Sequence, residues 1–198
     1  MPSYLVTGSS RGIGLGLVAE LLKDEKNIVI ATARSTAASP GLQQAGKTCT
    51  NIDEFMTEMQ FNLTSPIYLL REFLPLIRKS EAKKVLIMTS SLGSTELAGH
   101  MKGLANTYSV AKASLNMLIR KWSTTLKDDG ITTFLLHPGW VGVTELGSKI
   151  TNWMETYAPQ VTSLTVEDSA AGCIKVLNGV GPEDNGLCFS YDGTKIPW

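Results

Sequence analysis

The chain has 198 residues, which is enough for one domain with a sizeable core and short for two. Eighteen basic residues balance eighteen acidic ones, so no long-range field attracts nucleic acid or an anionic membrane. No apolar run approaches the ~20 residues of a membrane span. Three separated cysteines, Cys49, Cys173 and Cys188, indicate reduced thiols in a cytoplasmic protein rather than disulfides or metal ligands.

Buried strands and helices are predicted to alternate along the chain. Short apolar runs predict strands at 4–6, 28–33, 85–88, 131–136 and 187–190. Helical periodicity predicts helices at 13–22, 53–79, 107–127 and 165–177. Residues 35–50 are predicted to form a loop and residues 146–164 to be irregular. This alternation indicates a single domain, residues 1–198, with a doubly wound parallel sheet of the Rossmann type.

A glycine-rich turn, residues 7–14 (Thr-Gly-Ser-Ser-Arg-Gly-Ile-Gly), joins the first predicted strand to the first helix. Glycines let backbone N–H groups approach a pyrophosphate, and the helix N-terminus adds partial positive charge. The alternative is an ordinary structural turn, but the strand before it and the helix after it favour a dinucleotide site. The residues expected to bind the cofactor here are Gly8, Ser10, Arg11, Gly12, Ile13 and Gly14.

The end of the second predicted strand selects between two dinucleotides. An NAD site has an acidic residue about 20 residues beyond the glycines, where it binds the ribose 2′-hydroxyl. Here residues 31–34 are Ala-Thr-Ala-Arg, with no acid in reach. Arg34, helped by Arg11, can pair with a 2′-phosphate, which favours NADP(H). The alternative is that both arginines are solvated surface residues.

Tyr108 and Lys112 are four residues apart and therefore share one face of the predicted helix. A free tyrosine, with a pKa of about 10, is a poor acid or base at neutral pH. A neighbouring ammonium favours the phenolate and lowers that pKa into a useful range. The four-residue spacing alone is weak evidence for a catalytic pair. It is strengthened because the pair follows a predicted buried strand that ends in serines, in a chain that opens with the glycine-rich turn.

The chain resembles the short-chain dehydrogenase/reductase family. Within it, the chain is most similar to the sniffer-like carbonyl reductases and the norsolorinic acid ketoreductase-like group. The matching stretches are the glycine turn, 89–94 (TSSLGS), 108–117 (YSVAKASLNM), 137–141 (HPGWV) and the ending 192–198. They span almost the whole length of the chain.

The resemblance implies a role for each matching residue. Tyr108 would give a proton to a carbonyl oxygen, while Lys112 lowers the pKa of Tyr108 and binds the nicotinamide ribose. Ser90 would hydrogen-bond the substrate carbonyl, with Ser91 as the alternative. Asn62 would shape a backbone kink and hold a proton-relay water; a polar residue on the helix face is the competing interpretation. The residues expected to contact the nicotinamide end are Pro138, Gly139 and Val141.

Two histidines and four aromatic residues have less definite roles. His100 and His137 have no metal-ligand or triad partner in the sequence and are interpreted as structural. Four aromatic residues either line a pocket for aromatic ligands or pack in the core: Trp140, Trp153, Tyr157 and Trp198.

The sequence departs from the family pattern at two places. Thr144 lies one residue later than the family's threonine, so its bond to the nicotinamide carboxamide is not expected. Between Arg34 and the long helix, the family has a strand, a helix and another strand, which is roughly 30 residues or more. Only residues 35–51 fill that space here. We therefore expect a central segment to be missing and the sheet to have fewer strands than the family norm.

The resulting prediction is an NADP(H)-dependent reductase of a ketone or aldehyde, with an aromatic or polyketide-like substrate as one option. The alternative is a catalytically silent dinucleotide-binding or interaction protein derived from the same family. The resemblance also implies a homodimer or homotetramer packed through the helices beginning at Asp53 and Thr107. No metal, nucleic acid or membrane partner is expected.

Overall fold

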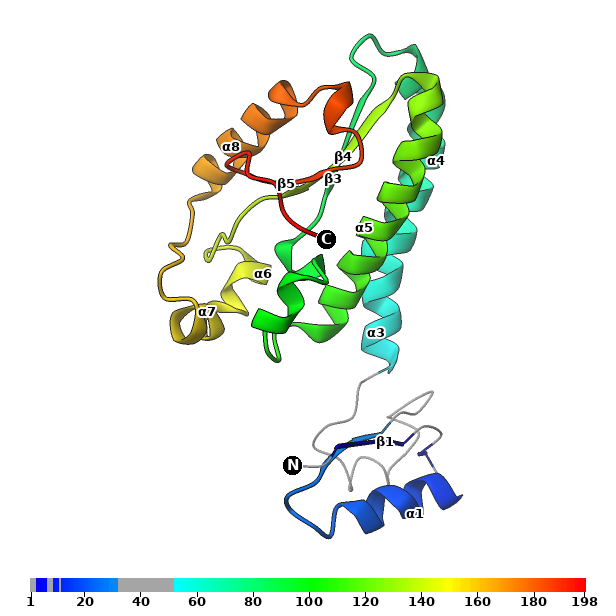
Figure 1. Ribbon diagram of the computed structural model, residues 1–198, viewed down its shortest axis with the longest axis vertical. Helices are drawn as coiled ribbons and strands as arrows, with labels where there is room; N and C mark the ends of the chain where they lie inside the picture. The colour runs from blue at the N-terminus through cyan, green and yellow to red at the C-terminus, as the bar shows by residue number, and fades with distance from the viewer. Residues whose placement is uncertain (1–2, 7–8, 11, 32–51) are drawn as a thin grey trace. The chain divides into compact units, whose positions relative to one another are not determined.

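A computed structural model describes residues 3–6, 9–10, 12–31 and 52–198, which are coloured in Figure 1. The chain divides into two compact units, Met1–Gln60 and Phe61–Trp198. The predicted loop at 35–50, together with Gly8, Arg11, Arg34 and Cys49, lies outside the described residues. That the whole chain is one domain stays a prediction.

The first unit contains a small strand–helix–strand motif. Strand β1 (Ser3–Val6) pairs in parallel with β2 (Ile28–Ala31), with Val6 opposite Ala31. Helix α1 (Gly12–Leu21) connects them, and α3 (Ile52–Met59) follows later in the unit. The apolar cluster consists of Val6, Val18, Val29 and Ala31, with Leu15, Leu21 and Leu22 packed against it. The predicted first strand, turn, helix and second strand are confirmed over the described residues.

Two side chains fix the ends of these elements. The buried Ser9 hydroxyl donates to the Val6 carbonyl at 2.7 Å, so it closes the turn where β1 ends. The Asn27 amide donates to the Leu21 carbonyl at 2.8 Å, which satisfies an acceptor at the end of α1.

A three-stranded parallel sheet forms the centre of the second unit. Its order is β3 (Lys84–Met88), β4 (Thr132–His137) and β5 (Cys188–Ser190), with Leu86 opposite Phe134 and Leu136 opposite Phe189. Short runs of β-branched and apolar residues form these strands. Gly130, at φ +73°, ends the helical segment that precedes β4. The predicted α/β fold with parallel strands is confirmed.

Helices cover both faces of this sheet (Figure 1). On one face, Leu115 and Ile119 of α5 (Asn106–Leu126) pack against Leu135. On the other face, Cys173 and Val176 of α8 (Val166–Gly179) pack against Phe134 and Leu136. Neighbouring residues of β4 therefore point to opposite faces, as a strand buried on both sides requires.

The long helix predicted at 53–79 is three consecutive helical segments. Helix α3 runs into a π-helical turn, η1 (Gln60–Thr64), and then into α4 (Ser65–Lys79). Pro66 lies in the first turn of α4, where its missing N–H costs nothing, and Pro75 stays inside the helix. Leu70 of α4 packs with Val85, on the same face of the sheet as α5.

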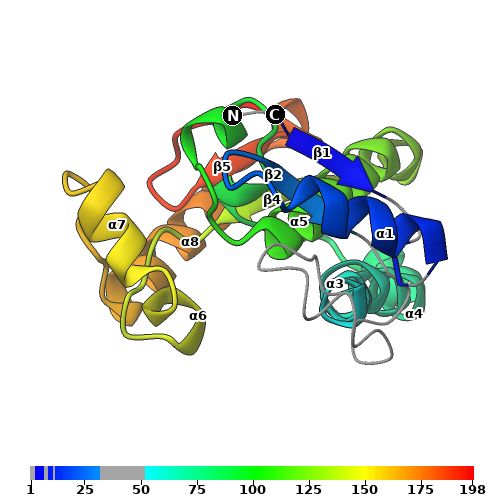
Figure 2. The same ribbon diagram turned by 90° about the horizontal axis from the view of Figure 1, so that it is seen from below.

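The prediction that 146–164 is irregular was wrong. This stretch contains most of α6 (Glu145–Ser148) and all of α7 (Thr151–Tyr157), which lie together at one end of the second unit (Figures 1 and 2). Helices of one or two turns are too short to show a 3.6-residue period. Short 3₁₀ segments complete the unit: η2 (Ser91–Gly93), η3 (Leu97–His100), η4 (Lys127–Asp129) and η5 (Pro182–Asp184).

Within the described part of the chain, no helix is both long and apolar enough to cross a membrane.

Thr165 caps the start of helix α8. The Thr165 hydroxyl accepts the Asp168 backbone N–H at 3.0 Å and donates to the Asp168 carboxylate at 2.8 Å. We expect Thr165→Ala to lower the free energy of unfolding by about 1 kcal/mol, because an N–H in the first turn loses its acceptor. Urea denaturation measures this change. The matched control is Thr156→Ala, whose hydroxyl donates only to the exposed Asn152 carbonyl; equal losses in both variants would contradict the capping role.

Candidate functional site

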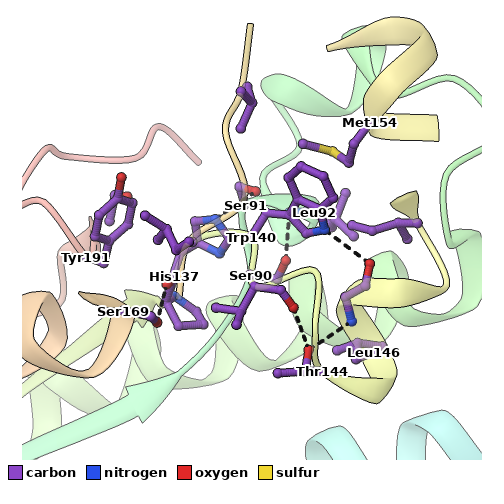
Figure 3. A pocket seen from close by; sticks show the side chains of 18 of the residues that line it. Ser90, Ser91, Leu92, His137, Trp140, Thr144, Leu146, Met154, Ser169 and Tyr191 are labelled. Carbon is purple, nitrogen blue, oxygen red and sulfur yellow. Dashed lines mark hydrogen bonds between the residues drawn. The ribbon is translucent and has the colours of Figure 1, made fainter. Parts of the chain in front are cut away.

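The second unit contains a cavity of about 920 Å³ where its three parallel strands end. Thr89 follows β3, Pro138 follows β4, and Ser190 is the last residue of β5; all three line the cavity. The carboxyl edge of a parallel sheet is where ligands bind in open α/β folds. Figure 3 shows the cavity from close by, with side chains from the strand ends facing those from α6 and α7.

The segment from Trp140 to Leu164, which contains α6 and α7, forms one wall of the cavity. Its two ends are joined at the base: the Leu164 N–H donates to the Trp140 carbonyl, and the Gly142 N–H to the Ser163 hydroxyl, both at 2.8 Å. The Trp140 indole N–H donates inside the segment, to Gly147 O at 3.1 Å. The two ends of this wall segment, one after β4 and one before α8, therefore lie next to each other.

A second attachment holds the outer part of the wall segment. The Trp153 indole N–H donates to the Lys102 carbonyl at 3.1 Å, so α7 is bonded to the loop before α5. The rings of Trp153 and Tyr157 lie 5.3 Å apart at their centroids. Of the four aromatic residues singled out in the sequence, Trp140, Trp153 and Tyr157 line the cavity, whereas Trp198 packs its ring 5.3 Å from the Arg120 guanidinium.

The three residues predicted to contact a nicotinamide all line the cavity just after β4: Pro138, Gly139 and Val141. Gly139 has φ +82°, and a Cβ there would lie 2.5 Å from Leu164 Cδ1. The left-handed backbone favours glycine here, and a larger residue would also displace the Leu164 side chain. Thr144 forms its hydrogen bonds within the wall segment: its hydroxyl donates to Val141 O at 2.8 Å and accepts the Gly147 N–H at 3.0 Å.

Tyr108 and Lys112 lie in the first turns of α5, with Tyr108 lining the cavity. The Lys112 ammonium sits 5.5 Å from the centroid of the Tyr108 ring and donates to Met88 O, at the end of β3, at 3.2 Å. The Lys112 side chain is only 9% exposed. A nearly buried cation is thus held against the phenol ring, as the spacing predicted.

Ser90 also lines the cavity and is buried. Its hydroxyl oxygen accepts the Leu92 N–H at 3.2 Å and caps η2. Because this bond uses only a lone pair, the hydroxyl proton of Ser90 is still available for donation. The predicted residues Ser90 and Tyr108 are therefore brought to one cavity, and Lys112 lies beside Tyr108.

The turn η2 approaches α5 so closely that only glycine fits at position 93. A Cβ on Gly93 would lie 2.9 Å from both the backbone carbon and Cβ of Lys112. Asn116 holds the two elements together: its amide donates to Gly93 O at 3.1 Å, and its side-chain oxygen accepts the Thr89 hydroxyl. Asn116 is not among the predicted site residues, although its place four residues after Lys112 puts it on the same helix face.

His137, interpreted from the sequence as structural, also lines the cavity. Its Nε2 lies 3.5 Å from the Ser91 hydroxyl oxygen, and its Nδ1 is buried and has no hydrogen-bond partner in the described structure. Burial lowers the pKa of His137 from its ordinary 6.5 to about 4, and the negative charge of Asp192 raises it by less. The imidazole is therefore neutral near pH 7. His100 also lines the cavity.

The remaining predicted site residues lie elsewhere. Asn62 is buried inside the π-helical turn η1, so the helix does depart from α geometry where the family resemblance implied a kink. Gly12, Ile13 and Gly14 form the start of α1 in the first unit, and Ser10 lies in the turn before it.

The chain belongs to the short-chain dehydrogenase/reductase family. A family model described as enoyl-(acyl carrier protein) reductase matches residues 16–178. An uncharacterized oxidoreductase of Schizosaccharomyces pombe is 28% identical over 249 aligned positions, which cover 98% of this chain and 97% of that protein. The alignment is longer than the 198 residues of this chain, so that relative carries additional residues. The C-signal of Myxococcus xanthus is 38% identical, over 69% of this chain and 74% of its own length.

Solved structures give the same assignment. An NADPH-bound carbonyl reductase from chicken fatty liver has a TM-score of 0.62 and 26% identity, covering all of this chain and 98% of that one. The Drosophila melanogaster carbonyl reductase Sniffer also has a TM-score of 0.62, at 24% identity and with full coverage of both chains, which shows the common fold. The predicted family resemblance is confirmed.

The buried His137 makes stability depend on pH in a defined window. In the unfolded chain His137 is protonated below about pH 6.5, whereas in the folded chain it stays neutral down to about pH 4. The contribution of neutral His137 to the free energy of unfolding is therefore complete above pH 6.5 and is lost as the pH falls to 4. At 1.36 kcal/mol per pKa unit, this loss is up to ~3 kcal/mol. Asp192, whose pKa is held below 3.8 by bonds from Thr194, titrates below this window.

Urea denaturation at pH 7.0, 5.5 and 4.5 measures this loss. We expect His137→Asn to flatten the dependence, and the control His100→Asn to keep the slope of the original protein. An unchanged slope in His137→Asn would show that other groups cause the loss.

Proposed function

We propose that the chain is an NADP(H)-dependent reductase of an uncharged, bulky ketone or aldehyde. The main support for this proposal is the Lys112 ammonium, which lies 5.5 Å from the centroid of the Tyr108 ring, beside an apolar cavity that Ser90 also lines. The family membership and the similarity to a carbonyl reductase that is NADPH-bound support the same reaction class.

The first unit fits the phosphate part of such a cofactor. Helix α1 begins at Gly12, within the glycine-rich stretch, and the N–H groups of a helix's first turn have no partners within the helix. Those groups and the helix dipole would bind the pyrophosphate through residues 8–14. Arg11 and Arg34 are the residues expected to pair with the 2′-phosphate, and Pro138, Gly139 and Val141 are those expected to contact the nicotinamide.

The bound cofactor would supply a hydride to the carbonyl carbon, and the residues of the cavity would complete the reduction. Ser90 donates a hydrogen bond to the carbonyl oxygen and fixes its position. Tyr108 gives its proton to that oxygen as the negative charge develops. The Lys112 ammonium stabilises the charge left on the phenol oxygen, and Asn62 would hold the water that returns a proton. Carbonyl carbon and oxygen thus each gain one hydrogen, giving an alcohol.

The reaction is tested with Tyr108→Phe. Phenylalanine keeps the ring against Lys112 but has no proton to give, so we expect turnover of quinones and aromatic ketones to fall at least ~100-fold. Consumption of NADPH, followed at 340 nm, measures the rate. The quenching of tryptophan fluorescence by NADPH should give a Kd within about threefold of the original protein. Joint loss of turnover and binding would make Tyr108 structural.

A catalytically silent dinucleotide-binding or interaction protein is the second candidate function. One observation favours it: the relative with 38% identity bears the name C-signal and not that of an enzyme. NADPH titration of the unmodified protein separates the two. No binding at millimolar NADPH would refute the reductase, and binding without turnover would favour the silent protein.

We also propose that two copies of the chain associate through α4 and α5. Leu69, Phe73 and Leu76 follow one another at helical spacing on α4 and are each more than half exposed. Met117 on α5 is 64% exposed. Such apolar helix faces are typical of surfaces between subunits.

This association is tested with Phe73→Glu. A buried carboxylate at an apolar interface is costly, so we expect the variant to elute as a monomer where the original protein elutes as a dimer or tetramer. Size-exclusion chromatography with light scattering measures the mass. Asn152→Glu, on the exposed face of α7, is the control and should keep the original mass. A monomeric original protein would refute the proposal.

A further inference from the structure

Four polar side chains around the cavity donate their hydrogen bonds to main-chain carbonyls. The indole N–H of Trp140 and that of Trp153 each donate to a carbonyl. The Ser169 hydroxyl donates to Pro138 O at 2.6 Å, and the Thr144 hydroxyl to Val141 O. These four donors hold the wall in place and are not available to a ligand.

Ser91 and His137 form a different kind of pair. They come from the ends of the adjacent strands β3 and β4, and both line the cavity. The Ser91 oxygen lies 3.5 Å from His137 Nε2, at the outer limit of a hydrogen bond. In Figure 3 the two side chains lie next to one another, beside Trp140 of the wall. The mechanism proposed above uses neither of them.

The buried Nδ1 of His137 determines which way this pair is polarised. A proton on Nδ1 would leave a donor N–H buried without an acceptor, whereas an unpaired lone pair there costs less. The proton of the neutral ring therefore belongs on Nε2, which donates to the Ser91 oxygen. The hydroxyl proton of Ser91 is then free to be donated into the cavity.

The surroundings select an uncharged acceptor. The residues that line the cavity in the described structure include no Lys, Arg, Asp or Glu, and His137 is neutral near pH 7. A carboxylate or phosphate would lose its hydration there without meeting a cation. An ether, ester or carbonyl oxygen has a smaller desolvation cost, and Ser91 would satisfy it.

We propose that Ser91, positioned by His137, forms a second oxygen-binding subsite of the cavity, which recognises an uncharged acceptor oxygen on an otherwise apolar ketone. The assignment rests on the proposed reductase function for the first oxygen, which Ser90 and Tyr108 would bind. Ser90 and Ser91 are consecutive, about 3.8 Å apart at their Cα atoms, so one small molecule can reach both. A single donor in an apolar pocket discriminates strongly between ligands with and without its acceptor.

The test uses two ligands of nearly equal shape, 2′-methoxyacetophenone and 2′-ethylacetophenone, in which an ether oxygen replaces a methylene. Quenching of Trp140 and Trp153 gives a Kd for each ligand without requiring turnover. We expect a preference of about tenfold for the methoxy compound, the size of one hydrogen bond. Ser91→Ala should abolish this preference, and Ser91→Thr, which restores a hydroxyl, should recover it.

Two further variants test whether the preference for the methoxy compound depends on the pair of Ser91 and His137. His137→Phe should reduce the preference, because the hydroxyl is no longer oriented. Ser114→Ala, on α5 and outside the cavity, is the matched control and should keep it. Equal affinity for the two ligands in the original protein, no binding of either at millimolar concentration, or an unchanged preference in Ser91→Ala would each overturn the subsite. A preference without any ketone turnover would support the subsite and refute the reductase.

Discussion

The close approach of η2 to α5 is the constraint on which the cavity depends. Gly93 touches the backbone of Lys112, and Asn116 bonds both Gly93 and Thr89, so the end of β3 is fixed to the helix that carries Tyr108. The ends of two elements that are distant in the sequence are thereby held at one place. The serines after β3 and the phenol on α5 face the same cavity because no side chain separates the two backbones.

The position of the Lys112 ammonium also depends on the end of β3. It is nearly buried, and its bond to Met88 O ties it to the last residue of β3. A buried cation is costly unless hydrogen bonds and negative charge compensate it. The bond to Met88 O offsets part of this cost and fixes the ammonium beside the Tyr108 ring.

The sequence was sufficient for the elements that have a clear period or a clear end signal. The strands of both units, the helix of Tyr108 and the cap at Thr165 all follow from residues that are near in sequence. The α6–α7 segment could not be predicted, because its helices are shorter than the period that reveals a helix. The pair of Ser91 and His137 could not be found either, since it depends on the pairing of β3 with β4, which is a contact between distant residues.

The joined base of the Trp140–Leu164 segment has a consequence for variation of the cavity wall. Two hydrogen bonds close the segment between the end of β4 and the start of α8, so its two ends are held together. Residues between these bonds can be replaced, shortened or lengthened without moving β4 or α8. The segment that forms this wall is separate from α5, which carries Tyr108 and Lys112. A change of sequence within the segment would therefore reshape the cavity and leave these two side chains in place.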